Sequence, residues 1–264
     1  SAASDVYKRQ IVTFQLIKRV FMSMKIVVMK FGGTSLANIE KIKNVAKIVI
    51  NNSKNNKILV VLSAMSGVTN QLQSYIDEVD YFPSEETDLV MTSGEQVTVG
   101  LLSMILNKQG VKSKPLLGWQ IPIVTDENHE KARILNIENK RIYHHFESYD
   151  VIVLTGFQGI SLSGQITSLG RGGSDTTAVA IASSLSAERC DIFTDVEGVF
   201  TADPNIVSNA KKIDKLAYEE MLEMSSTGAK VLQTRSVELA LKNNLTLQVL
   251  SSFTNEEGTY ILNE

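Results

Sequence analysis

The regular alternation of short apolar runs with longer amphipathic runs constrains this chain most. Five short runs are rich in Val, Ile and Leu, which predicts buried strands; they cover 25–31, 57–65, 150–157, 190–196 and 245–253. The longer runs carry apolar residues at helical spacing; they cover 36–52, 68–79, 87–110, 174–187, 215–224 and 228–244. A Ser-Gly pair within the alternating stretch 159–169 predicts a hairpin. Because strands alternate with helices, we expect an α/β fold: a three-layer αβα sandwich with a mostly parallel central sheet.

The composition fits one globular domain. The 264 residues are 43% hydrophobic and 21% charged, and the net charge is −3. No uninterrupted apolar run approaches the roughly 18 residues of a membrane span, so no membrane partner is expected. The single Cys190 excludes a disulfide framework within the chain and lies in a predicted strand, where we expect a small core residue. It also fits a reducing compartment, which favours a cytoplasmic location.

The first 23 residues differ in character from the rest. Residues 1–23 contain four Lys or Arg side chains and one Asp, a net charge of +3, so residues 24–264 carry −6. We interpret 1–23 as a leader, non-native or disordered, with an organellar targeting peptide as the minor alternative. Residues 24–264 are predicted to form one catalytic domain. Its acidic character argues against a nucleic-acid partner, because binding phosphates requires clustered Lys and Arg.

A glycine-rich turn follows the first predicted strand. Lys30 is the last charged position of that strand, and the stretch Gly32-Gly33-Thr34-Ser35 leads into a helix. Glycines let the backbone approach a ligand closely, and a helix N-terminus offers unpaired N–H groups to an anion. The turn is therefore a candidate phosphate site, although a plain strand–turn–helix with Ser35 as N-cap explains it about equally well.

A second glycine-rich turn precedes the predicted helix 174–187. Gly172 and Gly173 can form an anion-binding nest, and Ser174 can cap a helix that begins at Asp175. Arg171 offers a planar guanidinium that suits a carboxylate. Capping alone explains neither the arginine nor the paired glycines, so a binding site is the favoured interpretation.

Three further segments carry candidate residues. Thr194 and Asp195 end a predicted strand, and Phe200 and Asp203 follow in a turn-rich segment that suits a nucleotide or a simple hairpin. Lys230 is predicted in the first turn of a helix, where a cation opposes the helix dipole and therefore suggests a function. Glu95 near the start of a long helix suits either the helix dipole or a ligand.

Taken together, these segments resemble the aspartate kinases of the amino acid kinase superfamily. The motifs occur in the order of that family over residues 24–264; they are KFGGTS, VVLSAMSGVTN, SGEQ, TGFQG, LGRGGSDTTA, TDVEGVFTADP, MLEMSSTGAKVL, RSVELA and VLSSF…GT. One such motif is weak, but nine in order are specific. The resemblance implies the amino acid kinase fold without the regulatory domains of the ACT type that usually follow.

The resemblance also implies an activity and a set of site residues. The activity is ATP-dependent phosphorylation of the β-carboxylate of L-aspartate to 4-phospho-L-aspartate, the first step towards lysine, threonine, methionine and diaminopimelate. The implied catalytic residues are Lys30, Asp175 and Lys230. The implied substrate-binding residues are Ser63, Thr69, Glu95, Arg171, Gly172, Gly173 and Ser174. The implied nucleotide-binding residues are Lys30, Phe31, Gly32, Gly33, Thr34, Ser35, Ser174, Thr194, Asp195, Phe200, Asp203, Asn205 and Lys230.

The implied cofactor is ATP with Mg²⁺ that arrives with the nucleotide, and no metal site built by the protein itself is expected. The implied assembly is a homodimer. Phe200 and Asn205 stand where the family usually has Tyr and Arg. Two alternatives stay open: another amino acid kinase acting on glutamate, acetylglutamate or a nucleotide monophosphate, and a catalytically idle nucleotide-binding module.

Overall fold

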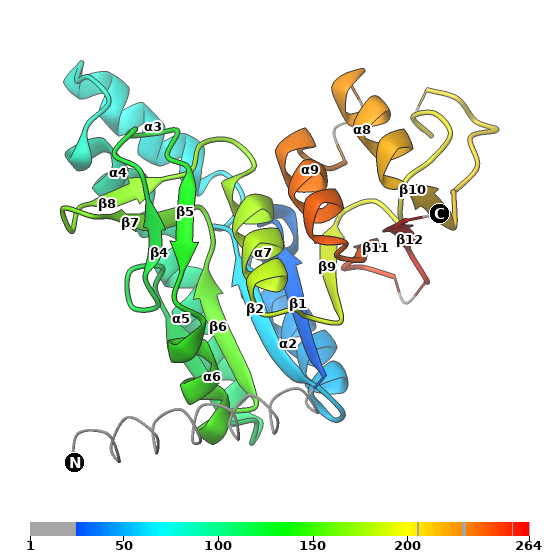
Figure 1. Cartoon of the computed structure of the whole chain (residues 1–264), viewed down its shortest axis with the longest axis horizontal. Helices are drawn as coiled ribbons and strands as arrows, with labels where there is room; N and C mark the ends of the chain where they lie inside the picture. Colours follow the sequence, from blue (N-terminus) through cyan, green and yellow to red (C-terminus); the bar gives the residue numbers. More distant parts are fainter. Residues whose placement is uncertain (1–24, 205, 229–230, 255, 264) are drawn as a thin grey trace, which may run out of the picture.

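The computed structural model describes residues 25–204, 206–228, 231–254 and 256–263. An eight-stranded sheet runs through its centre in the order β10-β12-β11-β9-β1-β2-β6-β3 (Figure 1). The strands are β1 (Ile26–Phe31), β2 (Lys57–Leu62), β3 (Ser113–Leu116), β6 (Val151–Thr155), β9 (Arg189–Thr194), β10 (Lys215–Ala217), β11 (Leu247–Ser251) and β12 (Thr259–Leu262).

The sheet is mostly parallel, as predicted. Strands β11, β9, β1, β2, β6 and β3 all pair in parallel, and the single antiparallel pairing in this sheet joins β11 to β12. The five predicted strands correspond to β1, β2, β6, β9 and β11, and Cys190 is buried on β9 as expected. The short strands β3, β10 and β12 were not predicted, because three or four residues carry too little periodicity to stand out.

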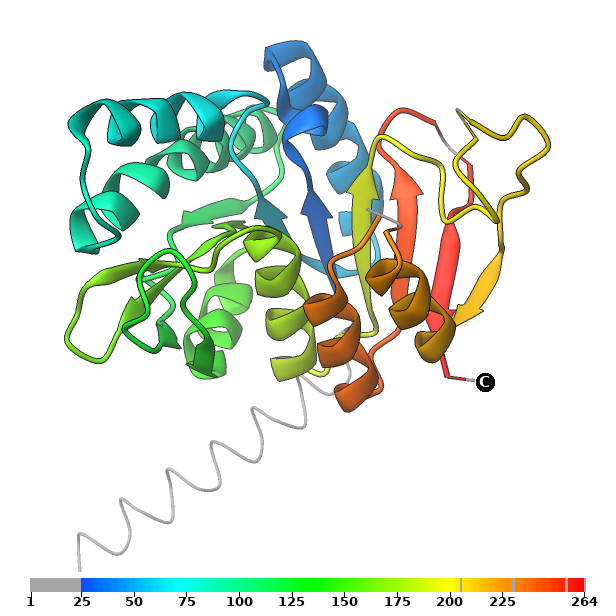
Figure 2. The same cartoon turned by 90° about the horizontal axis from the view of Figure 1, so that it is seen from above.

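Helices cover both faces of this sheet, which confirms the three-layer sandwich (Figure 2). The helices α2 (Ile39–Ser53) and α5 (Ser93–Lys108) pack on one face, where Val27 and Met29 of β1 join the same core as Val45. The other face carries α6 (Asn139–Ser148), α7 (Gly173–Ser184), α8 (Tyr218–Ser226) and α9 (Thr234–Asn243). Successive residues of a strand point to opposite faces, so β1 contributes to both cores.

A second, four-stranded sheet lies beside the first, in the order β5-β4-β7-β8. Its strands are β4 (Ile123–Thr125), β5 (Ile134–Ile137), β7 (Gln158–Ser161) and β8 (Ile166–Ser168). The antiparallel pair β7–β8 confirms the hairpin predicted in 159–169. Two helices, α3 (Val68–Val79) and α4 (Glu85–Met91), lie at the same end of the molecule (Figure 1). The sequence did not predict this sheet as a separate unit.

The long helix predicted over 87–110 is two helices that meet at Thr92. Together they form the segment Glu85–Lys108, whose most apolar window has a mean hydropathy of 1.4. By length and composition alone, this segment could cross a membrane. The segment is not an uninterrupted apolar run, since it contains Asp88 and Glu95. In the fold α5 packs against α2, β3 and β6, and 44% of that window is buried.

Three local predictions and one of the alternatives left open were wrong. The helix predicted from Gly228 begins at Thr234, since the backbone of Gln233 is extended at its N-cap. The helix predicted from Lys215 begins at Tyr218, after strand β10. Asn38, not Ser35, caps α2 by accepting a hydrogen bond from the Lys41 backbone N–H. The helix α7 begins at Gly173, so Ser174 lies inside its first turn and makes no cap.

Candidate active site

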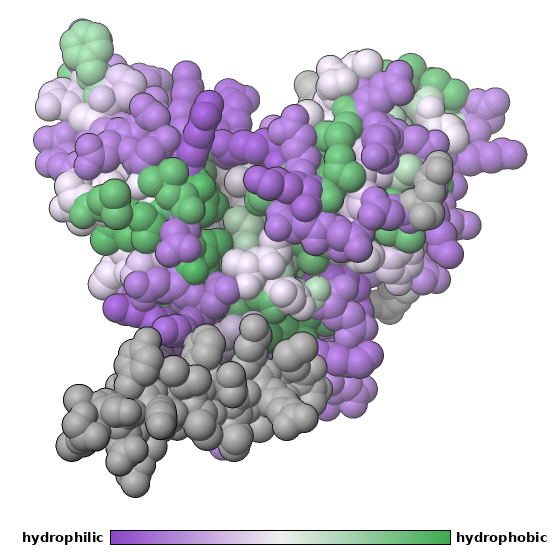
Figure 3. Space-filling view, in the orientation of Figure 1, coloured by the Kyte–Doolittle hydropathy of each residue, from purple (hydrophilic) through white to green (hydrophobic). Residues whose placement is uncertain are grey.

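The carboxyl ends of β1 and β2 and the start of α7 enclose a cavity of about 670 Å³. In Figure 3 the surface is notched between the part that carries α3 and the part that carries α8 and α9, and hydrophilic side chains lie on both sides of the notch. Parallel α/β sheets bind ligands beyond the carboxyl ends of their strands, so the position is the expected one. Nine of the predicted site residues line the cavity: Lys30, Ser63, Thr69, Glu95, Arg171, Gly172, Gly173, Ser174 and Asp175.

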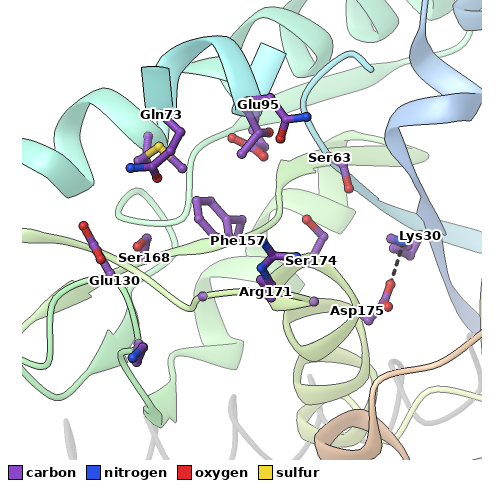
Figure 4. Close-up of a pocket in the computed structure, with 17 residues that line it drawn as sticks. Lys30, Ser63, Gln73, Glu95, Glu130, Phe157, Ser168, Arg171, Ser174 and Asp175 are labelled. Atoms are coloured by element: carbon purple, nitrogen blue, oxygen red, sulfur yellow. Dashed lines mark ion pairs between the residues drawn. The ribbon is translucent and has the colours of Figure 1, made fainter. Parts of the chain in front are cut away.

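Lys30 and Asp175 form an ion pair at one end of the cavity (Figure 4). The Lys30 Nζ lies 2.6 Å from Asp175 Oδ1, and each side chain is 12% exposed. Lys30 projects from β1, and Asp175 occupies the first turn of α7, where the helix dipole favours a carboxylate. The pair therefore holds an ammonium group in place at the cavity wall.

Glu95 enters the same cavity from α5. Its side chain is 3% exposed, and Oε1 accepts a hydrogen bond of 3.1 Å from the Ala64 backbone N–H. Oε2 is buried without a hydrogen-bond partner. Burial raises the pKa of Glu95 to about 7, against a smaller lowering by its backbone hydrogen bonds. A buried, unpartnered carboxylate oxygen is costly, and a cationic ligand group would satisfy it.

The Arg171–Ser174 turn forms the cavity floor beside Asp175 (Figure 4). Arg171 is exposed and can reach a ligand carboxylate. Gly172 has φ +70°, and a Cβ there would lie 2.0 Å from Gln233 Cγ. A Cβ on Gly173 would lie 2.9 Å from Phe157 Cδ2. Packing within the protein therefore favours glycine at both positions. From the sequence, these glycines were explained only by an anion-binding nest.

The cavity also contains residues that the sequence did not single out: Asn70, Gln73, Met91, Glu130, Lys131, Phe157, Ser168 and Gly170. Phe157 has φ +70°, which is unusual for a side chain of this size, and its backbone carbonyl accepts from the Leu169 N–H. The motif TGFQG, which contains Phe157, could have indicated from the sequence that this residue belongs to the site. Ser168 and Glu130 carry no such signal, because their place depends on the second sheet.

Three of the other predicted nucleotide-binding residues lie near the ends of β1, β9 and β11 and do not line this cavity: Phe31, Ser35 and Thr194. Ser35 Oγ is 2.7 Å from Ser252 Oγ, and the Thr194 carbonyl accepts from the Ser252 backbone N–H. Phe31 is fully buried and stacks on Phe193 at 4.4 Å between ring centroids, so its side chain belongs to the core. The structure thus joins the KFGGTS turn to the end of β9 beside the cavity.

The remaining predicted nucleotide-binding residues differ in exposure. Gly32 and Gly33 are half-buried, Thr34 is exposed, and the Gly32 N–H donates to the Phe193 carbonyl at 3.4 Å. Asp195 and Asp203 are exposed, and Phe200 pairs with Lys212 in an isolated antiparallel bridge. Lys230 and Asn205 lie outside the described residues.

Among the described residues, no group of three or more His, Cys, Asp or Glu side chains is placed to hold a metal ion. A Mg²⁺ ion that is already bound to the phosphates of a nucleotide needs only one or two carboxylates from the protein. A single carboxylate such as Asp175 can meet this requirement.

The sequence of the chain is similar to those of known aspartokinases. The chain is 48% identical over 244 residues to an aspartokinase of Rickettsia felis, covering 90% of this chain and 61% of that protein. It is 47% identical over 243 residues to an aspartokinase of Geobacillus stearothermophilus, covering 91% of this chain and 60% of that protein. The chain thus spans about 60% of the length of these curated relatives.

A solved structure has the same fold. The E. coli aspartokinase III in complex with aspartate and ADP superimposes with a TM-score of 0.82 at 29% identity, over 91% of this chain and 65% of that one. The family model described as the amino acid kinase family matches residues 25–251, which include all of the described residues that line the cavity. The chain belongs to the amino acid kinase family.

Proposed function

We propose that this chain carries the catalytic domain of an aspartate kinase, within residues 24–264. It transfers the γ-phosphoryl group of ATP to the β-carboxylate of L-aspartate and releases 4-phospho-L-aspartate and ADP. One observation carries the proposal: a single cavity combines the Lys30–Asp175 pair with Arg171 and the unpartnered oxygen of Glu95. The aspartokinase relatives and the E. coli complex with aspartate and ADP support it.

The acceptor end of the cavity suits a small amino acid with an additional carboxylate. Glu95 Oε2 takes the α-ammonium group, because it is buried and has no partner of its own. Arg171 binds a carboxylate of the acceptor in the planar fork geometry. Ser63, Thr69, Ser174 and the backbone at Gly172 and Gly173 supply further polar contacts around it.

The chemistry requires alignment and charge neutralisation rather than a base. The β-carboxylate of aspartate is ionised at neutral pH, so one of its oxygens attacks the γ-phosphorus directly. The new O–P bond forms as the bond from phosphorus to the β,γ-bridging oxygen breaks, and that electron pair leaves with ADP. Lys30, held by Asp175, reduces the repulsion between the two anions. By family likeness Lys230 acts from the other side of the phosphoryl group.

The nucleotide lies along the KFGGTS turn and the end of β9. The turn Gly32 to Ser35 holds the phosphates; Gly33 and Thr34 offer their backbone N–H groups, because the N–H groups of Gly32 and Ser35 already donate to the Phe193 and Gly32 carbonyls. Thr194, Asp195, Phe200 and Asp203 line the nucleotide, and by family likeness Asn205 belongs to the same set. Mg²⁺ supplies further charge neutralisation when it binds with ATP. We also propose a homodimer in the cytoplasm, no nucleic-acid or membrane partner, and a place at the start of lysine, threonine, methionine and diaminopimelate biosynthesis.

A hydroxamate-trapping assay tests the substrate. The chain is incubated with ATP, Mg²⁺ and hydroxylamine together with aspartate, glutamate or acetylglutamate, and phosphorylation of UMP is followed by ADP release. We expect aspartyl hydroxamate and no comparable product from the other acceptors. Turnover of glutamate, acetylglutamate or UMP without turnover of aspartate contradicts the proposal. ATP binding without turnover of any acceptor identifies the idle nucleotide-binding module instead.

A further inference from the structure

A buried carboxylate beside the acceptor cavity has no role in the proposed chemistry. Asp88 lies in α4, is 0% exposed and belongs to neither apolar core. Its Oδ1 accepts from the Ser168 hydroxyl and from the Glu130 backbone N–H at 3.0 Å. Its Oδ2 lies 2.8 Å from His129 Nδ1. One carboxylate thus ties α4 to β8 and to the loop between β4 and β5.

Two of these three partners form part of the cavity wall. Ser168 and Glu130 line the cavity, and in Figure 4 they lie on the side of it away from Lys30. Met91, almost one helical turn after Asp88, lines the cavity as well. The carboxylate therefore joins two wall segments that are far apart in the sequence.

A second buried polar link fixes the other end of α4. The Gln158 side chain of β7 donates from Nε2 to the Thr92 carbonyl at 3.0 Å. Thr92 marks the junction of α4 and α5, and Glu95 follows it in the first turn of α5. Together the two links hold α4, and with it the helix start that carries Glu95, against the second sheet.

We propose that Asp88 is a positioning residue for the acceptor: by joining α4 to Ser168 and to the 129–130 loop, it sets the spacing between Glu95 and the opposite wall of the cavity. The inference rests on the proposed function. A small acceptor must contact both walls at once, and a displacement of about 1 Å of a positioning group can lower the rate by up to roughly a hundredfold. Without the carboxylate, the Ser168 hydroxyl and the Glu130 N–H lose a buried partner.

Steady-state kinetics of Asp88→Ala tests this role. We expect the KM for aspartate to rise roughly tenfold or more, whereas the KM for ATP stays within about twofold of wild type, because the hydrogen bonds of Asp88 run to Ser168, Glu130 and His129, none of which is a predicted nucleotide-binding residue. Asp88→Asn keeps one acceptor oxygen for Ser168 and Glu130, and we expect it to restore most of the affinity for aspartate. The control is Asp150→Asn, which changes a carboxylate paired with Lys57 at 2.9 Å at the opposite end of the sheet.

Two outcomes overturn the role. One is an equal change in the KM for aspartate and the KM for ATP; the other is a lower melting temperature of Asp88→Ala with both KM values unchanged. If Asp88→Ala does not fold, the variant His129→Leu tests the positioning role instead, because His129 contacts Asp88 and does not line the cavity. It should raise only the KM for aspartate, by roughly two- to fivefold, and an unchanged KM for aspartate refutes the role.

The wild-type chain in the same assay separates the two proposals. If it phosphorylates aspartate but the variants show no selective change in the KM for aspartate, the positioning role is wrong and the proposed function stands. If the wild-type chain does not phosphorylate aspartate, the proposed function is wrong, and the role of Asp88 in acceptor positioning is wrong with it.

Discussion

Lys30 Nζ lies 2.6 Å from Asp175 Oδ1, although the two residues belong to different halves of the chain. The contact joins the end of the central strand β1 to the first turn of α7. An ammonium group that is only 12% exposed keeps its place because the carboxylate opposes it. This pair defines the phosphoryl end of the proposed site.

Lys30→Met should lower kcat for phosphoryl transfer roughly 10²- to 10³-fold, because a charge that stabilises the transition state is removed. It should also lower the free energy of unfolding by roughly 3 kcal/mol, because Asp175 is left without a partner. The double variant Lys30→Met/Asp175→Asn should regain stability and stay inactive. Lys57→Met, which breaks the pair with Asp150, is the control for activity. Full activity of Lys30→Met contradicts the assignment.

Glu95→Gln should make the substrate-free protein more stable at high pH. Folding raises the pKa of Glu95 from 4.5 to about 7 through burial. The folded protein therefore binds more protons than the unfolded chain in this window, and the free energy of unfolding falls as the pH rises from about 4.5 to 7. The gain of the variant over wild type should be roughly 2–3 kcal/mol larger at pH 8 than at pH 5.

Urea unfolding of wild type and Glu95→Gln at the two pH values measures this difference. An equal gain at both pH values would show that Glu95 is not protonated on folding. The same variant should bind aspartate weakly, since the neutral amide cannot oppose an ammonium group.

Arg189→Met should destabilise the fold more at pH 7.5 than at pH 5. Arg189 Nε lies 2.8 Å from Asp191 Oδ1, and Asp191 is 2% exposed. Burial raises the pKa of Asp191 from 3.8 to about 6, and Arg189 opposes that rise. Without Arg189 the carboxylate is buried and unpaired above its pKa, which costs roughly 3 kcal/mol, whereas below its pKa it takes a proton and the cost falls. Thermal unfolding at both pH values tests this, and a loss of stability that is independent of pH refutes it.

Gly172→Ala should be more disruptive than Gly67→Ala. Both glycines have positive φ, +70° and +85°, so alanine strains the backbone at either position by roughly 1 kcal/mol. A Cβ at Gly172 also meets Gln233 Cγ at 2.0 Å, whereas a Cβ at Gly67 meets nothing within 4 Å. The further variant Gln233→Ala should relieve part of the loss at Gly172. Equal free energies of unfolding for the two alanine variants would show that the contact with Gln233 is unimportant.

The sequence by itself determined the strands β1, β2, β6, β9 and β11 and the class of the fold. Hydrophobic periodicity is a local property, so each of these runs could be interpreted without knowing its neighbours. The glycine-rich turns after β1 and before α7 could also be predicted, because a cluster of glycines is likewise a local property of the sequence. Ser35, the alternative cap for the first helix, lies three residues before the actual cap Asn38, and the cap predicted at Ser174 lies inside α7, because the exact start of a helix depends on how the preceding turn packs.

The resemblance named nine of the residues that line the cavity, but only the tertiary structure showed their contacts and their burial. The approach of Lys30 to Asp175, the unpartnered oxygen of Glu95 and the three hydrogen bonds to Asp88 all depend on elements that are distant in sequence. The second sheet places Ser168 and Glu130 opposite α4, and its short strands left almost no pattern of their own. A carboxylate on an isolated helix is an ordinary solvated group. It acquires its particular chemistry only when burial removes water and leaves specific donors in its place.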